Sequence, residues 1–130
     1  MISSQYNPLD QNRLSRLRSV VGAGPVLILT HDNPDPDALA SGKAFATLLK
    51  SAWNITSRSL YGGTVQRAEN HVMLNLLTPE WEHIDALIGL DQYSAVTMVD
   101  TQPGAGNNCL PDTHTPDIVI DHHLPIRKKI

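Results

Sequence analysis

The sequence predicts an α/β fold in which a mainly parallel sheet is flanked by helices in a three-layer, doubly wound arrangement. Apolar, partly β-branched runs of strand length lie at 26–30, 94–99 and 117–120, and segments with helical spacing of apolar residues lie between some of them. Continuous apolar runs are typical of strands that are covered on both faces. Strands that alternate with helices favour a parallel sheet with right-handed crossovers.

The first half of the chain contains two expected helices and two expected strands. A helix is predicted over 9–21, where apolar residues recur at three- and four-residue spacing, and the strand at 26–30 follows. Asp37 is the expected N-cap of the next helix, whose broad apolar face runs to about Ser51. A second strand is predicted over 54–61.

The second half predicts a helix over 65–77 and strands over 94–99 and 117–120. The stretch 79–90 is ambiguous, with a short helix expected around 83–88. At 130 residues the chain fits one domain.

Charge and cysteine content exclude several classes of protein. A formal net charge of −3 provides no global basic field, so duplex nucleic acid is not an expected partner. Cys109 is the single cysteine, which excludes an intramolecular disulfide and fits a reducing compartment. The N-terminus has no signal-peptide pattern and no segment is apolar enough to span a membrane, so we expect a cytoplasmic protein without a membrane partner.

Three apolar runs each end on side chains that bind metals: His31, Asp100, and the triplet Asp121-His122-His123. The first run continues to Asp37 and places one imidazole and three carboxylates within seven residues. Carboxylates held close together raise one another's pKa unless cations neutralise them. Because ligands bind beyond the carboxyl ends of parallel strands, these side chains predict a divalent-metal site of a two-metal phosphoesterase.

The Asp-His-His triplet at 121–123, together with the stretches 61–70 and 99–104, resembles the DHH phosphoesterase superfamily. The most similar group is the bifunctional oligoribonucleases and pAp phosphatases. The resemblance implies hydrolysis of phosphodiester or phosphomonoester bonds in short oligoribonucleotides or pAp-type nucleotides by a two-metal-activated water. Inorganic pyrophosphatase, polyphosphatase and cyclic-dinucleotide phosphodiesterase activities stay open, because members of the superfamily share this machinery.

The resemblance also implies a ligand set. His31, Asp35 and Asp100 would hold one divalent ion, and Asp37, Asp100 and His122 would hold the other, with Asp100 as the bridge. The oxygen-rich, cysteine-free set favours two Mn²⁺ ions, with Mg²⁺ as the alternative.

Three further residues belong to the predicted site. By the same resemblance His123 faces the substrate phosphate, and Asp121 orients an imidazole from outside the ligand shell. Arg67 is either a phosphate-binding donor or an ordinary helix-surface charge. The expected substrate partner is short single-stranded RNA or a small phosphorylated nucleotide.

One departure from the family pattern concerns the C-terminus. The family carries a further aspartate ligand and a Gly-rich basic domain after the triplet, whereas this chain stops seven residues beyond His123. We therefore expect a partial DHH domain, with a helical region at 1–24, a metal-site core at 25–123 and a truncated end at 124–130. Such a chain is expected to be weakly active or inactive and to self-associate through exposed or swapped strands. The alternative is a non-catalytic module that binds phosphate or nucleotides.

Overall fold

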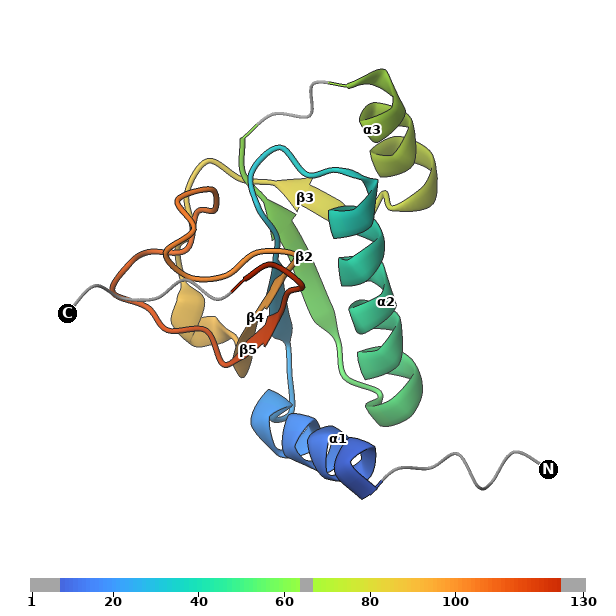
Figure 1. The fold of residues 1–130 in the computed structure, drawn as a ribbon, viewed down its shortest axis with the longest axis vertical. Helices are drawn as coiled ribbons and strands as arrows, with labels where there is room; N and C mark the ends of the chain where they lie inside the picture. The colour runs from blue at the N-terminus through green and yellow to red at the C-terminus, as the bar shows by residue number, and fades with distance from the viewer. Residues whose placement is uncertain (1–7, 64–66, 125–130) are drawn as a thin grey trace.

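The computed structural model of the protein describes residues 8–63 and 67–124. Within these residues the centre of the fold is a five-stranded sheet in the order β3-β2-β1-β4-β5, and every neighbouring pair is parallel (Figure 1). The strands are β1 (Val26–Leu29), β2 (Ser57–Tyr61), β3 (Trp81–His83), β4 (Ala95–Val99) and β5 (Ile118–Ile120). The predicted α/β class with a parallel sheet is confirmed.

The helices of the described residues are α1 (Pro8–Val21), α2 (Pro36–Trp53) and α3 (Ala68–Val72). Helix α3 continues directly into a π-helical turn, η2 (Met73–Leu77), and a short 3₁₀ helix, η3 (Leu90–Gln92), precedes β4. Helices α1 and α2 were both predicted, as was a helix over 65–77, whose residues 65 and 66 lie outside the described part of the chain.

The order of the strands creates a switch point between β1 and β4. From β1 the chain adds β2 and then β3 on one side, and then returns to place β4 and β5 on the other side of β1. At such a point the connections leave two neighbouring strands in opposite directions, which opens a crevice at their carboxyl ends. Topology therefore singles out the residues that follow β1 and β4 as the place for a ligand.

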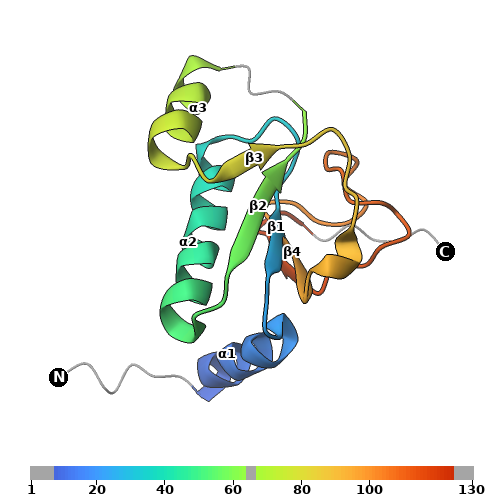
Figure 2. The ribbon, with the colours of Figure 1, turned by 180° about the vertical axis from the view of Figure 1, so that it is seen from behind.

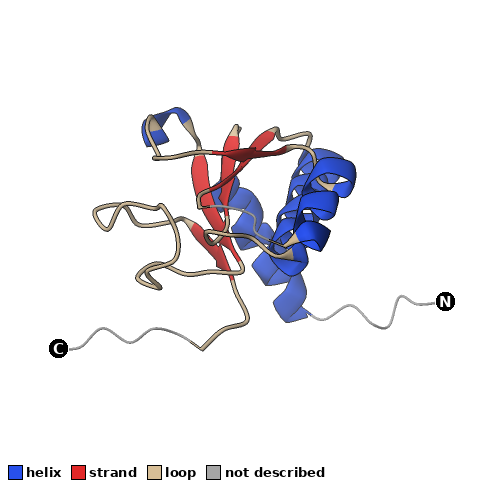
Figure 3. Cartoon of the chain, turned by 90° about the horizontal axis from the view of Figure 1, so that it is seen from above, coloured by secondary structure: helices blue, strands red, loops and turns tan. Residues whose placement is uncertain are grey.

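The two faces of the sheet are covered differently. Helix α2 lies along one face, as Figures 1 and 2 show, and Val26 and Ile28 belong to the core cluster on that side. Leu27 and Leu29 belong to the opposite cluster, because side chains alternate along a strand. Figure 3 shows that loops and η3 lie on this second face of the described structure, where helices were expected.

Helix α2 begins differently from the prediction. Asp35 is its N-cap, not Asp37, and the Asp35 Oδ1 atom accepts a hydrogen bond from the Ala38 amide at 3.0 Å. Pro36 occupies the first helical position, where a backbone N–H would have no acceptor within the helix, so proline costs no hydrogen bond there. The helix extends to Trp53, slightly beyond the expected end at Ser51.

The expected helix at 83–88 is wrong. Residues 81–83 form the edge strand β3, and the chain after them is irregular as far as η3. Trp81 explains the difference, because the residue is only 4% exposed and its Nε1 atom donates to the Leu39 carbonyl at 3.0 Å. This hydrogen bond holds residues 81–83 against α2 and next to β2, where they pair with β2 as a strand.

The strand β5 forms an edge of the sheet, with Val119 and Ile120 each 44% exposed. The expected self-association through this region stays a prediction. Among the described helices, none combines the length and the apolar character that a bilayer crossing needs.

Candidate metal centre

Hydrogen bonds tie together the carboxyl ends of β1, β4 and β5. The buried Thr30 hydroxyl donates to the Val99 carbonyl at 2.9 Å, which joins the end of β1 to the end of β4. The Asp100 amide donates to the Ile120 carbonyl at 2.8 Å, which joins β4 to β5. The three segments that carry the predicted ligands therefore start from a common edge of the sheet.

Asp100 lies at the middle of this edge, and its residue is only 8% exposed. Its Oδ1 atom is 3.1 Å from His122 Nε2, and its Oδ2 atom is 3.5 Å from His31 Nε2. The backbone at Asp100 has φ +56°, a left-handed conformation that costs a non-glycine residue about 1–2 kcal/mol. Strain of this kind persists where the surroundings hold a side chain in place, as they do here.

His31 presents its Nε2 atom to two carboxylates. Its Nδ1 atom is 2.8 Å from the Asp32 carbonyl oxygen, which can only accept, so Nδ1 is the donor. Nε2 then faces Asp100 and also lies 4.0 Å from Asp35 Oδ1. Nε2 is therefore the ring nitrogen that is available to bind a cation held between these carboxylates.

Two groups of potential ligands share Asp100 as a common member. The first is His31, Asp35 and Asp100, and the second is Asp100, His122 and His123; in each, one ligand atom per residue lies within 4.8 Å of the others. Carboxylate oxygen and imidazole nitrogen are donors that suit Mn²⁺ and, less well, Mg²⁺. The residues at this edge of the sheet therefore fit the binding of a divalent cation.

The Asp121 carboxylate is hydrogen-bonded to His123. Its Oδ1 atom is 2.5 Å from His123 Nδ1, and Gln102 Nε2 donates to its Oδ2 atom at 2.9 Å. Burial raises the pKa of Asp121, but the hydrogen bonds from His123 and Gln102 outweigh burial and leave this pKa lowered. The same hydrogen bond to Asp121 raises the pKa of His123 against a smaller effect of desolvation. The pair therefore favours a protonated His123 beside an ionised Asp121.

Like Asp121, two other predicted site residues, Asp37 and Arg67, lie outside both ligand groups. Asp37 is exposed in the first turn of α2, and Arg67 is exposed immediately before α3. The Arg67 carbonyl accepts hydrogen bonds from the amides of Asn70 and His71 at 3.1 Å, which organises the start of that helix. The site roles of Asp37 and Arg67 stay predictions.

Sequence reasoning missed the polar loop that follows Asp100. Gln102 and Asn107 contact the segments that carry the histidines. A cavity of about 170 Å³ opens beside this loop. Among the residues that line it are Asp100, Thr101, Gln102, Asn107, Asp121 and His123. The available signal was the Thr-Gln pair directly after the strand-end aspartate.

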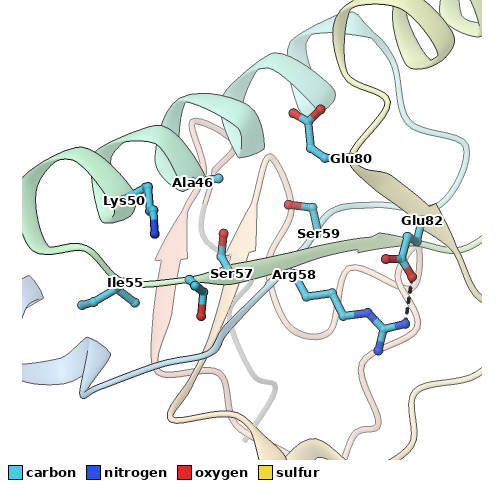
Figure 4. A pocket seen from close by; sticks show the side chains of 9 residues that line it. Ala46, Lys50, Ile55, Ser57, Arg58, Ser59, Glu80 and Glu82 are labelled. Carbon is cyan, nitrogen blue, oxygen red and sulfur yellow. Dashed lines mark hydrogen bonds and ion pairs between the residues drawn. The ribbon is translucent and has the colours of Figure 1, made fainter.

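A larger cavity of about 500 Å³ lies between α2 and β2. In Figure 4 the amine of Lys50 and the hydroxyls of Ser57 and Ser59 point into it, and Arg58 is paired with Glu82 at 2.8 Å. It is built on the first residues of β2, away from the carboxyl ends of the strands. The candidate metal centre and this cavity are therefore separate features.

Comparison with known proteins gives two partial similarities. The chain is 42% identical over 100 residues to an uncharacterized protein of Methanocaldococcus jannaschii, a match that covers 76% of this chain and 20% of that protein. It is 38% identical over 48 residues to a protein of Streptococcus agalactiae described as a probable manganese-dependent inorganic pyrophosphatase, covering 37% of this chain and 15% of that protein.

The chain thus spans a fifth or less of the length of these curated relatives. No family model matches the chain. No solved structure matches it significantly either. The streptococcal similarity supports a coarse link to the DHH phosphoesterases, because manganese-dependent pyrophosphatases are members of that superfamily.

Proposed function

We propose that this chain forms the two-metal part of a manganese-dependent phosphoesterase. The observation that carries the proposal is the position of Asp100, whose two carboxylate oxygens face histidines from two different segments, at 3.1 Å and 3.5 Å. A buried carboxylate between two imidazoles can serve two cations at once. The partial similarity to a manganese-dependent pyrophosphatase supports the same class of chemistry.

Each ligand has a defined task in this proposal. His31, Asp35 and Asp100 hold one ion, while Asp100 and His122 hold the other with Asp37 as the further carboxylate. A pair of divalent cations, when bound, lowers the pKa of a water molecule and neutralises phosphoryl oxygens during in-line displacement. The protein supplies positioning and a fixed electrostatic environment, which are the main requirements of phosphoryl transfer.

His123 is assigned to the substrate. Since its hydrogen bond to Asp121 raises its pKa, the imidazole is favoured in the cationic form, which repels a metal ion and attracts a phosphate. The charged ring can donate a hydrogen bond to a phosphoryl oxygen. Asp121 supports this role by holding the ring from the other side.

The proposed substrates are short oligoribonucleotides and pAp-type nucleotides, which carry terminal or internal phosphates that such a site can reach. Inorganic pyrophosphate is the second candidate, because the streptococcal relative bears that activity in its description. A non-catalytic phosphate-binding module uses the same ligands without turnover.

Calorimetry with Mn²⁺ tests the metal centre, and incubation with pAp, a diribonucleotide and pyrophosphate tests the chemistry. We expect two ions per chain, and Asp100→Asn should abolish both binding events. Manganese-dependent release of mononucleotide or phosphate identifies the substrate. Two bound ions with no hydrolysis of any of the three favours the binding module, and absence of Mn²⁺ binding refutes the metal centre.

A further inference from the structure

The segment Thr101–Leu110, which we call the positioning loop, leaves the end of β4 and contacts the partners of two site histidines. We propose that this loop orients His31 on one side of Asp100 and His123 on the other. The inference rests on the proposed function. It assigns Thr101, Gln102 and Asn107 as positioning residues. They belong to the hydrogen-bond network around the partners of the histidines, and none of them is a predicted metal ligand.

The first arm of the loop leads to His31. The Thr101 hydroxyl donates to Asn107 Oδ1 at 2.9 Å, which fixes the Asn107 residue. The Asn107 carbonyl accepts a hydrogen bond from the Asp32 amide at 2.5 Å. The Asp32 carbonyl is the acceptor for His31 Nδ1, so this chain of contacts holds in place the residue that keeps the proton of His31 on Nδ1.

The second arm leads to His123. Gln102 Nε2 donates to Asp121 Oδ2 at 2.9 Å and to the Leu124 carbonyl at 3.0 Å, so it binds both sides of the triplet. The other oxygen of the Asp121 carboxylate contacts His123 Nδ1 at 2.5 Å. Gln102 thereby orients the Asp121 carboxylate, and this carboxylate in turn orients the His123 imidazole. His123 Nε2 is then the ring nitrogen that can face a substrate.

The loop is itself held in one arrangement. Asn108 Nδ2 donates to the Thr101 hydroxyl at 3.3 Å and to the Gln102 carbonyl at 3.2 Å. The Leu110 amide donates to Asn108 Oδ1 at 3.2 Å, and the Leu110 side chain is 8% exposed within the core cluster on the second face of the sheet. Both arms therefore start from a base that the sheet anchors.

The two arms should have different consequences. Removing a partner that orients a metal-bound histidine weakens metal affinity by about 10- to 100-fold. Loss of the first arm is therefore expected to weaken Mn²⁺ binding. Loss of the second arm is expected to weaken phosphate binding, since His123 faces the substrate.

The variants Thr101→Val and Gln102→Leu remove the donors of one arm each at nearly constant size. Gln92→Leu is the matched control, because Gln92 lies in η3, before β4 and away from its carboxyl end. Calorimetry should measure Mn²⁺ binding and then binding of inorganic phosphate to the Mn²⁺-loaded chain. We expect Thr101→Val to lose about 10- to 100-fold in Mn²⁺ affinity, with Thr101→Ser restoring it. Gln102→Leu should keep the Mn²⁺ affinity and lose phosphate binding.

Nitrogen NMR of the histidine rings in the metal-free chain provides a readout that is independent of metal. Wild-type His31 should carry its proton on Nδ1, and Thr101→Val should show a mixture of the two tautomers. Asn107→Leu breaks the same hydrogen bond between Thr101 and Asn107 from an exposed position, and it serves if Thr101→Val does not fold. An unchanged His31 tautomer in both variants, or equal losses in both arms, overturns the proposal. If wild-type protein binds no Mn²⁺, the proposed function fails while the tautomer experiment still decides the role of the loop.

Discussion

Replacing Asp100 with asparagine should remove all stabilisation of the fold by Mn²⁺. Asparagine keeps the size of the side chain and tolerates the left-handed backbone at φ +56°, so the substitution changes the charge with little strain. At a Mn²⁺ concentration of about 100 times the dissociation constant, each bound ion stabilises the folded chain by about 2.7 kcal/mol. Because Asp100 belongs to both ligand groups, the loss is that of two ions, about 5 kcal/mol.

Thermal unfolding with and without Mn²⁺ measures this effect. For a chain of this length, 1 kcal/mol corresponds to about 4 °C in Tm, so the wild-type protein should gain about 20 °C at that concentration. Asp100→Asn should gain nothing. Asp35→Asn should keep about half of the gain, because Asp35 belongs to one group only and asparagine preserves its capping of α2.

Asp91→Asn is the control for loss of one negative charge, since Asp91 lies in η3 before the start of β4. This variant should keep the full Mn²⁺-dependent gain in Tm. The bridging geometry is refuted if Asp100→Asn keeps half of the gain or more. It is equally refuted if Asp35→Asn and Asp100→Asn lose the same amount.

Three further outcomes follow from local contacts. Gly42→Ala should lower the free energy of unfolding in urea, because its Cβ would lie 2.0 Å from Trp81 Cζ2 and overpacking costs about 1–3 kcal/mol, more than the helix propensity it gains. Burial raises the pKa of Cys109, so iodoacetamide should alkylate the native thiol more slowly at neutral pH than the urea-unfolded thiol. The raised pKa of His123 means that its pair with Asp121 stabilises the fold below about pH 6.5 and that this stabilisation is lost as the pH rises through the folded pKa. Asp121→Asn should therefore lower Tm more at about pH 5.5 than at about pH 9.

The parts of the fold that sequence could predict are those set by local pattern. The strands β1 and β4 are continuous apolar runs, and a parallel sheet brings the residues after them to one edge, so the meeting of His31 with Asp100 follows from pattern and topology. The start of α2 was misplaced because aspartates flank Pro36 on both sides, and the preference of proline for the first helical turn decides between them.

Tertiary contacts set the parts that sequence could not predict. The local sequence only weakly indicates a strand at 81–83. The strand forms because the Trp81 indole donates a hydrogen bond to a backbone carbonyl of α2. The positioning loop contains Gly104 and Gly106 and has the composition of a turn. Its role depends on a hydrogen bond that Gln102 donates to Asp121 and on one that the Asn107 carbonyl accepts from the Asp32 amide, and no spacing rule encodes these contacts.

The ligands of the candidate centre come from segments that are far apart in the sequence and that the sheet brings together. A similarity over a short stretch of sequence therefore covers only some of these ligands. Thr30 and Val99, which directly precede His31 and Asp100, are 69 residues apart in the chain and are joined by a buried hydrogen bond. The similarity to the streptococcal pyrophosphatase extends over 48 residues, less than that separation. It can therefore cover one side of the centre but not both. The case for two cations rests on the adjacency of β4 to both β1 and β5, which places a strained, buried aspartate between the imidazoles of His31 and His122.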